Sequence, residues 1–125
     1  MANSPLMDKS KEFALQIIKV CNYVKQNKKE SVITNQLIRS GTSVGANIRE
    51  AFYGHGTADF IAKLQIALKE CSESEYWIEL LIESGYYDNN EILVQCVEIK
   101  KLLIVSINTA KNKLNRWYKN DTSVI

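Results

Sequence analysis

Apolar residues recur at helical spacing in four long runs, and this periodicity constrains the fold more than any other feature of the chain. The runs predict helices over about 5–27, 32–53, 58–84 and 89–119. Only a few residues separate each predicted helix from the next, so consecutive helices must lie antiparallel. The sequence therefore predicts an all-α protein, one domain over residues 1–125, built as an antiparallel up-down-up-down four-helix bundle.

The composition agrees with one ordinary globular domain, since 46% of the residues are hydrophobic and 24% are charged. The N-terminal region lacks an apolar signal segment, and no apolar stretch approaches the roughly 20 residues that a membrane span needs. We therefore expect a cytoplasmic protein that does not enter membranes. Cys21, Cys71 and Cys96 each lie on the apolar stripe of a different helix, which predicts buried, reduced thiols that serve packing.

The predicted helices are unequal in length. At about 1.5 Å per residue, the third and fourth are roughly 40–45 Å long and the first two roughly 30–33 Å. The longer pair should project beyond the shorter pair, and its end carries the apolar residues Leu114 and Trp117. A neighbouring subunit is the simplest cover for such residues, which motivates a hypothesis of self-association.

Charge is unevenly distributed along the chain. Residues 1–52 carry a net charge of +4, residues 53–92 of −6 and residues 93–125 of +4. Basic residues beside aromatic ones can neutralise phosphates and stack on bases, which favours nucleic-acid binding. The alternative is a solvated helix face that pairs with the acidic third helix of another subunit. The candidate nucleic-acid-binding residues are Lys28, Lys29, Lys100, Lys101, Lys111, Lys113, Arg116, Trp117 and Lys119.

Two glycines, Gly41 and Gly45, lie four residues apart inside the second predicted helix. Each costs about 1 kcal/mol relative to alanine in a helix interior. Their missing side chains allow another helix to approach, so we interpret both as positions of close helix packing. A phosphate-binding loop would need a preceding strand and a Gly-Lys-Ser/Thr ending, and the sequence has neither here.

Polar residues beside these glycines repeat at helical spacing, and Glu75 lies on the apolar stripe of the third helix. A carboxylate in that position must be paired, and Arg39 is the expected partner, with Asn47 completing the network and Glu70 able to join it. We interpret the set as a structural polar network: Arg39, Ser43, Asn47, Glu50, Glu70 and Glu75.

Carboxylates inside a four-helix bundle also suggest a di-iron site, which requires a Glu-x-x-His motif on each of two helices. The single histidine, His55, falls in the turn between the second and third helices. Acid-base catalysis between Glu70 and Glu75 has no accompanying nucleophile. We therefore expect no catalytic residue, no metal and no cofactor, and a protein that is not an enzyme.

Several segments resemble the bacterial four-helix-bundle proteins encoded in intervening sequences of large-subunit ribosomal RNA. The most specific is Ser-Val-Gly-Ala-Asn-Ile-Arg-Glu-Ala at 43–51, and the others are 39–42, 59–60, 67–70, 75–77 and 80–81. The family is also similar to the accessory variability proteins of diversity-generating retroelements. The resemblance implies a homo-oligomer, a pentamer, and in the retroelement branch a basic surface that engages RNA or RNA/DNA and a reverse transcriptase. Two classes of function remain open: a nucleic-acid-binding oligomer and a protein-interaction scaffold.

Overall fold

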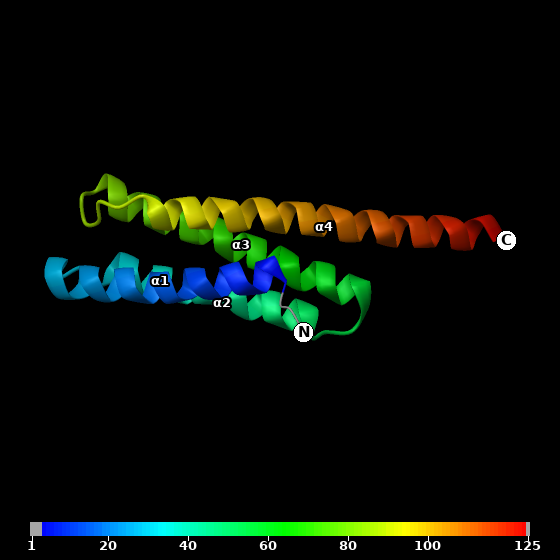
Figure 1. Ribbon diagram of the computed structural model, residues 1–125, viewed down its shortest axis with the longest axis horizontal. Helices are drawn as coiled ribbons and strands as arrows, with labels where there is room; N and C mark the ends of the chain where they lie inside the picture. The colour runs from blue at the N-terminus through cyan, green and yellow to red at the C-terminus, as the bar shows by residue number, and fades with distance from the viewer. Residues whose placement is uncertain (1–3, 125) are drawn as a thin grey trace.

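The computed structural model describes the backbone of residues 4–124 and the side chains of residues 4–118. It contains four helices: α1 (Pro5–Lys28), α2 (Val32–Phe52), α3 (Gly56–Glu83) and α4 (Glu91–Val124). Consecutive helices run antiparallel (Figure 1). The predicted all-α four-helix bundle is confirmed. The fourth helix begins two residues later than predicted. Residues 87–90 have no regular secondary structure, and Asn89 Oδ1 accepts a hydrogen bond from the Glu91 N–H at the helix start.

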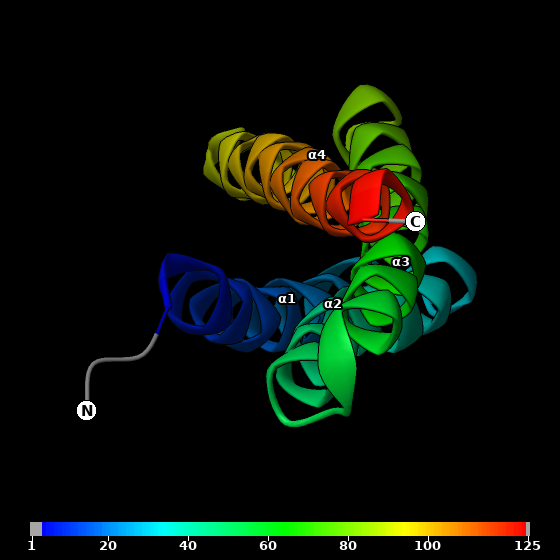
Figure 2. The same ribbon diagram turned by 90° about the vertical axis from the view of Figure 1, so that its right-hand side faces the viewer.

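Each helix packs against the next one in the chain, and α1 also packs against α4, which closes the bundle. The packing is most extensive between α2 and α3 and least extensive between α1 and α4. Viewed from the end, α1 and α4 diverge while α3 lies between α4 and α2 (Figure 2). The four helices therefore enclose one core.

The core is built from apolar side chains at three- and four-residue spacing on all four helices, as the sequence pattern requires. Among its largest fully buried members are Phe13, Ile17, Leu37, Ile48, Leu64, Ile78, Ile99 and Leu103. Cys21, Cys71 and Cys96 are free thiols with no exposed surface. The prediction that the three cysteines are buried is confirmed.

The contact between α1 and α2 is closest at Gly41. A Cβ atom there would lie 2.9 Å from Cγ1 of Ile17, which is shorter than real Cβ contacts. At Gly45 a Cβ atom would lie 3.4 Å from Ser10 Oγ, an ordinary van der Waals distance. Only Gly41 is therefore required by the helix approach, and it compensates its low helix propensity by allowing Ile17 to pack against the α2 backbone.

The contact between α2 and α3 differs from the expected polar network. Ser74, rather than Glu75, occupies the buried position, and its hydroxyl donates to Ser40 Oγ at 2.8 Å. Glu75 lies one residue, or about 100°, further round α3 and faces α4. It accepts a hydrogen bond from Lys100 Nζ at 2.6 Å instead of pairing with Arg39.

Arg39 lies at the edge of the same contact and pairs with two other carboxylates of α3. Its Nη1 donates to Glu70 Oε2 at 3.2 Å, and its Nη2 contacts Glu73, which also accepts from the Trp77 indole N–H. The remaining expected members bond elsewhere. Ser43 and Asn47 donate to backbone oxygens one turn earlier in α2, and Glu50 pairs with Lys63 at 3.6 Å.

Candidate nucleic-acid interface

The basic candidates from the sequence lie at three separate places on the bundle. Lys28 and Lys29 lie at the α1–α2 turn, at the end of the long axis opposite the C-terminal end of α4 (Figure 1). Lys100 and Lys101 lie in the first third of α4. The others lie near its end: Lys111, Lys113, Arg116, Trp117 and Lys119, of which the Lys119 side chain is outside the described residues. A single surface containing all nine residues is therefore not formed within one subunit.

Lys100 is engaged inside the protein. Its ammonium group donates to Glu75 Oε1, and this hydrogen bond raises the pKa of Lys100 above its ordinary value. The side chains of Lys100 and Glu75 are only 30% and 20% exposed. A phosphate would have to compete with this ion pair, so Lys100 is a poor candidate for nucleic-acid contact, whereas its neighbour Lys101 is exposed.

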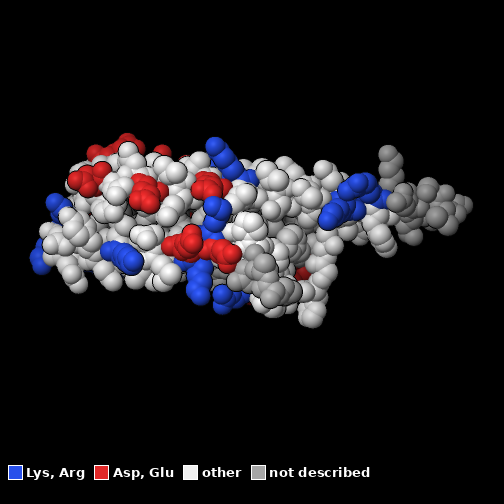
Figure 3. Space-filling view, in the orientation of Figure 1, with Lys and Arg blue, Asp and Glu red and all other residues white. Residues whose placement is uncertain are grey.

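The end of α4 is an exposed basic segment. The helix has 34 residues against 24 in α1, which at ~1.5 Å per residue makes it about 15 Å longer. Its last turns extend past the other helices (Figure 1). We call residues 111–118 the α4 arm. All of its basic side chains are exposed, and Figure 3 shows basic groups gathered there, away from the acidic groups over α3 and the start of α4.

The aromatic residues of the α4 arm are also open to solvent. Trp117 is 60% exposed and Tyr118 is 56% exposed. Their rings lie edge to face, with the ring centroids 5.1 Å apart. Leu114, in contrast, is half-buried against the core. Two large apolar rings beside cations on a projecting helix form a surface suited to stacking and phosphate contact together.

Two hollows adjoin the α4 arm. One, of about 530 Å³, lies between α4 and the α2–α3 turn, and its walls include Phe52, Phe60 and Val105. The other, of about 390 Å³, is bounded by Thr57, Ala58, Leu114 and Trp117. Lys113 borders both hollows. An apolar floor with a cation at its rim can hold a planar ring whose attached group is anionic.

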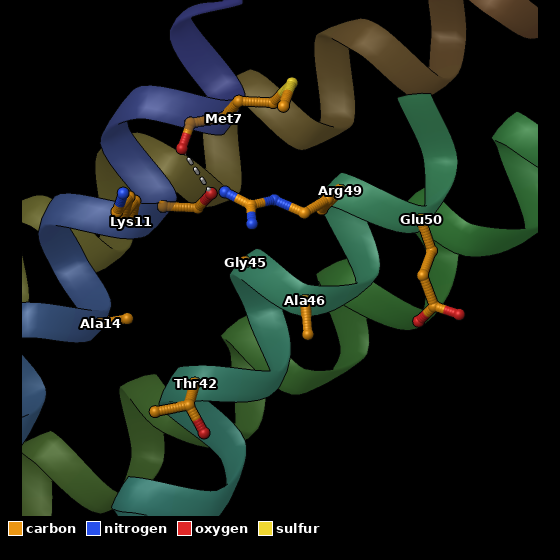
Figure 4. A pocket seen from close by; sticks show the side chains of 9 residues that line it. Met7, Lys11, Ala14, Thr42, Gly45, Ala46, Arg49 and Glu50 are labelled. Atoms are coloured by element: carbon orange, nitrogen blue, oxygen red, sulfur yellow. Dashed lines mark hydrogen bonds between the residues drawn. The ribbon is translucent and has the colours of Figure 1, made fainter. Parts of the chain in front are cut away.

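A third hollow, of about 420 Å³, separates α1 from α2 and contains residues that the sequence did not suggest as candidates. Small residues form it, among them Ala14, Gly45 and Ala46, and Lys11 and Arg49 border it. Arg49 extends over Gly45 toward α1, while Glu50 points away (Figure 4). Arg49 follows Gly45 by four residues, so the sequence placed both on one face of α2. Nothing local indicated that Lys11 of another helix would join them.

Comparison with known proteins decides the family. The model of the 23S rRNA-intervening sequence protein family matches residues 3–105 of this chain. The chain belongs to this family. The resemblance seen in the sequence is confirmed.

A solved structure supports the assignment. This chain is similar to a protein of unknown function from the S23 ribosomal protein family of Bacteroides thetaiotaomicron. The two share 48% sequence identity, and their structures superpose with a TM-score of 0.79. The similarity covers 82% of this chain and 97% of that chain. No curated protein matches the chain.

The family match ends at residue 105, before the α4 arm begins. The α1–α2 hollow with Lys11 and Arg49 lies inside the matched residues, as does Lys101. The match to the 23S rRNA-intervening sequence protein family therefore includes most of the bundle and that hollow, but it does not include the arm. The arm is a candidate nucleic-acid contact because of its own charge and exposure.

Over residues 4–118, no group of three His, Cys, Asp or Glu side chains is arranged to hold a metal ion. His55 lies at the start of α3, exposed, where its backbone N–H donates to Asp59 at 3.3 Å. None of the helices, within the part of the chain that was searched, combines the length and apolar character of a membrane span.

Proposed function

We propose that this protein is a non-enzymatic homo-oligomer that binds structured RNA or an RNA/DNA hybrid through the α4 arm. The observation that carries the proposal is the exposure of Lys111, Lys113 and Arg116 beside Trp117 and Tyr118 on a helix end that projects from the bundle. Cations contribute sequence-independent affinity by releasing counterions from phosphates, and aromatic rings contribute stacking on unpaired bases. Several arms in one oligomer would add their affinities through multivalency.

Neutralising the arm should weaken RNA binding. We expect Lys111→Gln/Lys113→Gln to reduce affinity for a structured RNA by about tenfold at moderate salt, and to reduce the slope of log K against log salt by about 1.5, because each lost phosphate contact removes roughly 0.7–0.9 from the slope. Fluorescence anisotropy with a labelled RNA hairpin that carries an unpaired loop, at several salt concentrations, measures both quantities.

The matched control is Lys19→Gln/Lys69→Gln, which removes the same charge from exposed positions of α1 and α3. It should change affinity by less than about twofold if the arm is the contact surface. Equal losses in the two variants would show that only net charge matters. No binding by the wild-type protein at low salt would overturn the proposal.

A second candidate function, a protein-interaction scaffold, is favoured by the apolar hollow containing Phe52, Phe60 and Val105 beside the exposed Trp117. Another subunit, or a protein partner such as a reverse transcriptase, would occupy this hollow. If basic arms instead pair with the acidic end of α3 in a neighbouring subunit, Glu79→Lys/Glu83→Lys should dissociate the oligomer.

Sedimentation velocity at micromolar concentration measures this dissociation, and Lys19→Glu/Lys69→Glu serves as a charge-reversal control outside the acidic end. The scaffold function requires that the oligomer dissociates while no RNA binding is seen at any salt concentration. A wild-type monomer would contradict self-association and the pairing of basic arms with α3 of a neighbouring subunit.

A further inference from the structure

Two buried thiols face each other across the contact between α3 and α4. The Sγ atoms of Cys71 and Cys96 are 3.8 Å apart, and neither residue has any exposed surface. Each thiol also lies 3.4 Å from the backbone oxygen of the other residue. These reciprocal contacts show that the two side chains point toward each other. Packing of α3 against α4 therefore places the two sulfur atoms side by side.

A disulfide requires the sulfur atoms to approach to about 2.05 Å, so each would move by roughly 1 Å. Rotation of the two side chains and a small adjustment of the helices can supply a movement of this size. We propose that Cys71 and Cys96 are a redox-sensitive dithiol that a hydroperoxide converts into a disulfide linking α3 to α4.

The reaction proceeds in two balanced steps. The Cys71 thiolate attacks one oxygen of the peroxide, the O–O bond breaks, and Cys71 sulfenic acid and a hydroxide or alkoxide form. The Cys96 sulfur then attacks the Cys71 sulfur, the S–S bond forms, the S–O bond breaks, and the Cys96 proton leaves with the hydroxyl group as water. Two thiols are oxidised and one peroxide is reduced.

The order of attack follows from the hydrogen bond within the pair. Either thiol can donate to the other across the 3.8 Å contact. Once Cys71 is ionised only the Cys96 thiol can donate, and this hydrogen bond lowers the pKa of Cys71 against the opposing effect of burial and raises the pKa of Cys96. Cys71 is therefore the sulfur that reaches the thiolate form first, and the thiolate is the nucleophile.

The Glu75–Lys100 ion pair lies beside the dithiol along α3 and α4. Each partner follows its cysteine by four residues, or about one helical turn. The Glu75 carboxylate raises the pKa of both thiols and the Lys100 ammonium group lowers it. Breaking this ion pair should open a path for the peroxide.

Cys21 provides an internal control. It has no exposed surface, like the other two cysteines, but its Sγ contacts the Thr34 carbonyl oxygen at 3.6 Å rather than another thiol. Burial raises the pKa of its thiol to about 12. A reagent that merely unfolds the protein would expose and oxidise all three cysteines alike.

To test this inference, the protein is treated with hydrogen peroxide and the remaining thiols are alkylated. Its peptides are then mapped by mass spectrometry without reduction. We expect a peptide crosslinked between Cys71 and Cys96 and an alkylated Cys21. Oxidation should raise Tm by on the order of 10 °C, because the crosslink restricts the unfolded chain. Absence of the crosslink, or oxidation of Cys21 at the same rate, would overturn the inference.

Four variants refine the test. Glu75→Gln should accelerate crosslinking several-fold, because it breaks the ion pair with Lys100 and removes a carboxylate that raises the pKa of both thiols. Glu79→Gln, one turn further along α3 and outside the ion pair, should not change the rate. Cys96→Ala should leave Cys71 as a sulfenic acid that a carbon nucleophile traps, whereas Cys71→Ala should leave Cys96 much less reactive. Equal rates in the two glutamine variants would exclude the gating role of the ion pair, and faster trapping at Cys96 in Cys71→Ala than at Cys71 in Cys96→Ala would contradict the order of attack.

Discussion

Gly41→Ala is expected to destabilise the protein by up to about 2 kcal/mol. The new Cβ atom would lie 2.9, 3.1 and 3.2 Å from three atoms of Ile17, a fully buried side chain that cannot swing into solvent. Overpacking of this kind typically costs about 1–3 kcal/mol, and the gain in helix propensity, about 1 kcal/mol, offsets only part of it. Urea unfolding monitored by circular dichroism measures the difference.

The same substitution one turn later supplies the control. Gly45→Ala adds a Cβ atom at ordinary contact distance from Ser10, so the propensity gain should dominate and stabilise the protein by roughly 0.5–1 kcal/mol. The two variants should therefore change stability in opposite directions. Ile17→Ala, which removes all three contacting atoms, should cost less stability in the Gly41→Ala background than in the wild-type protein. Stabilisation by both Gly→Ala substitutions would mean that α1 does not approach α2 closely at Gly41.

Ser74→Leu should cost about 3 kcal/mol. Ser74 has no exposed surface, and its hydroxyl lies 2.8 Å from that of the equally buried Ser40, where α2 and α3 have no room for a branched apolar chain. Overpacking and loss of the hydroxyl partner act together. Thermal and chemical unfolding should both report the loss.

Glu75→Leu, one residue along, should change stability by less than about 1 kcal/mol, because it removes only a partly exposed ion pair with Lys100. The pair of leucine variants thus decides which residue of α3 faces α2. If Glu75→Leu lost more stability than Ser74→Leu, Glu75 would occupy the buried position that the sequence alone predicted for it.

The α4 arm is a candidate site that the sequence predicted in part. Cations alternating with aromatic residues near the chain end were visible in the sequence, and so was the greater length of the last helix. The sequence also grouped Lys100 with these cations, although it is held by Glu75 of α3. Charge is a property of a residue, whereas its availability depends on the partner that folding brings beside it.

The sequence by itself determined the four helices and their antiparallel order, because periodicity, polar turns and short connections are local signals. Only the tertiary structure decided which side chains meet between helices: Ser74 with Ser40, Glu75 with Lys100, Cys71 with Cys96, and Lys11 with Arg49 around one hollow. A helical residue one position along turns by about 100°, so a small change in the rotation or axial shift of a helix exchanges its partners. That rotation and shift are set by packing of the whole core, including the close approach at Gly41, and no local pattern encodes them.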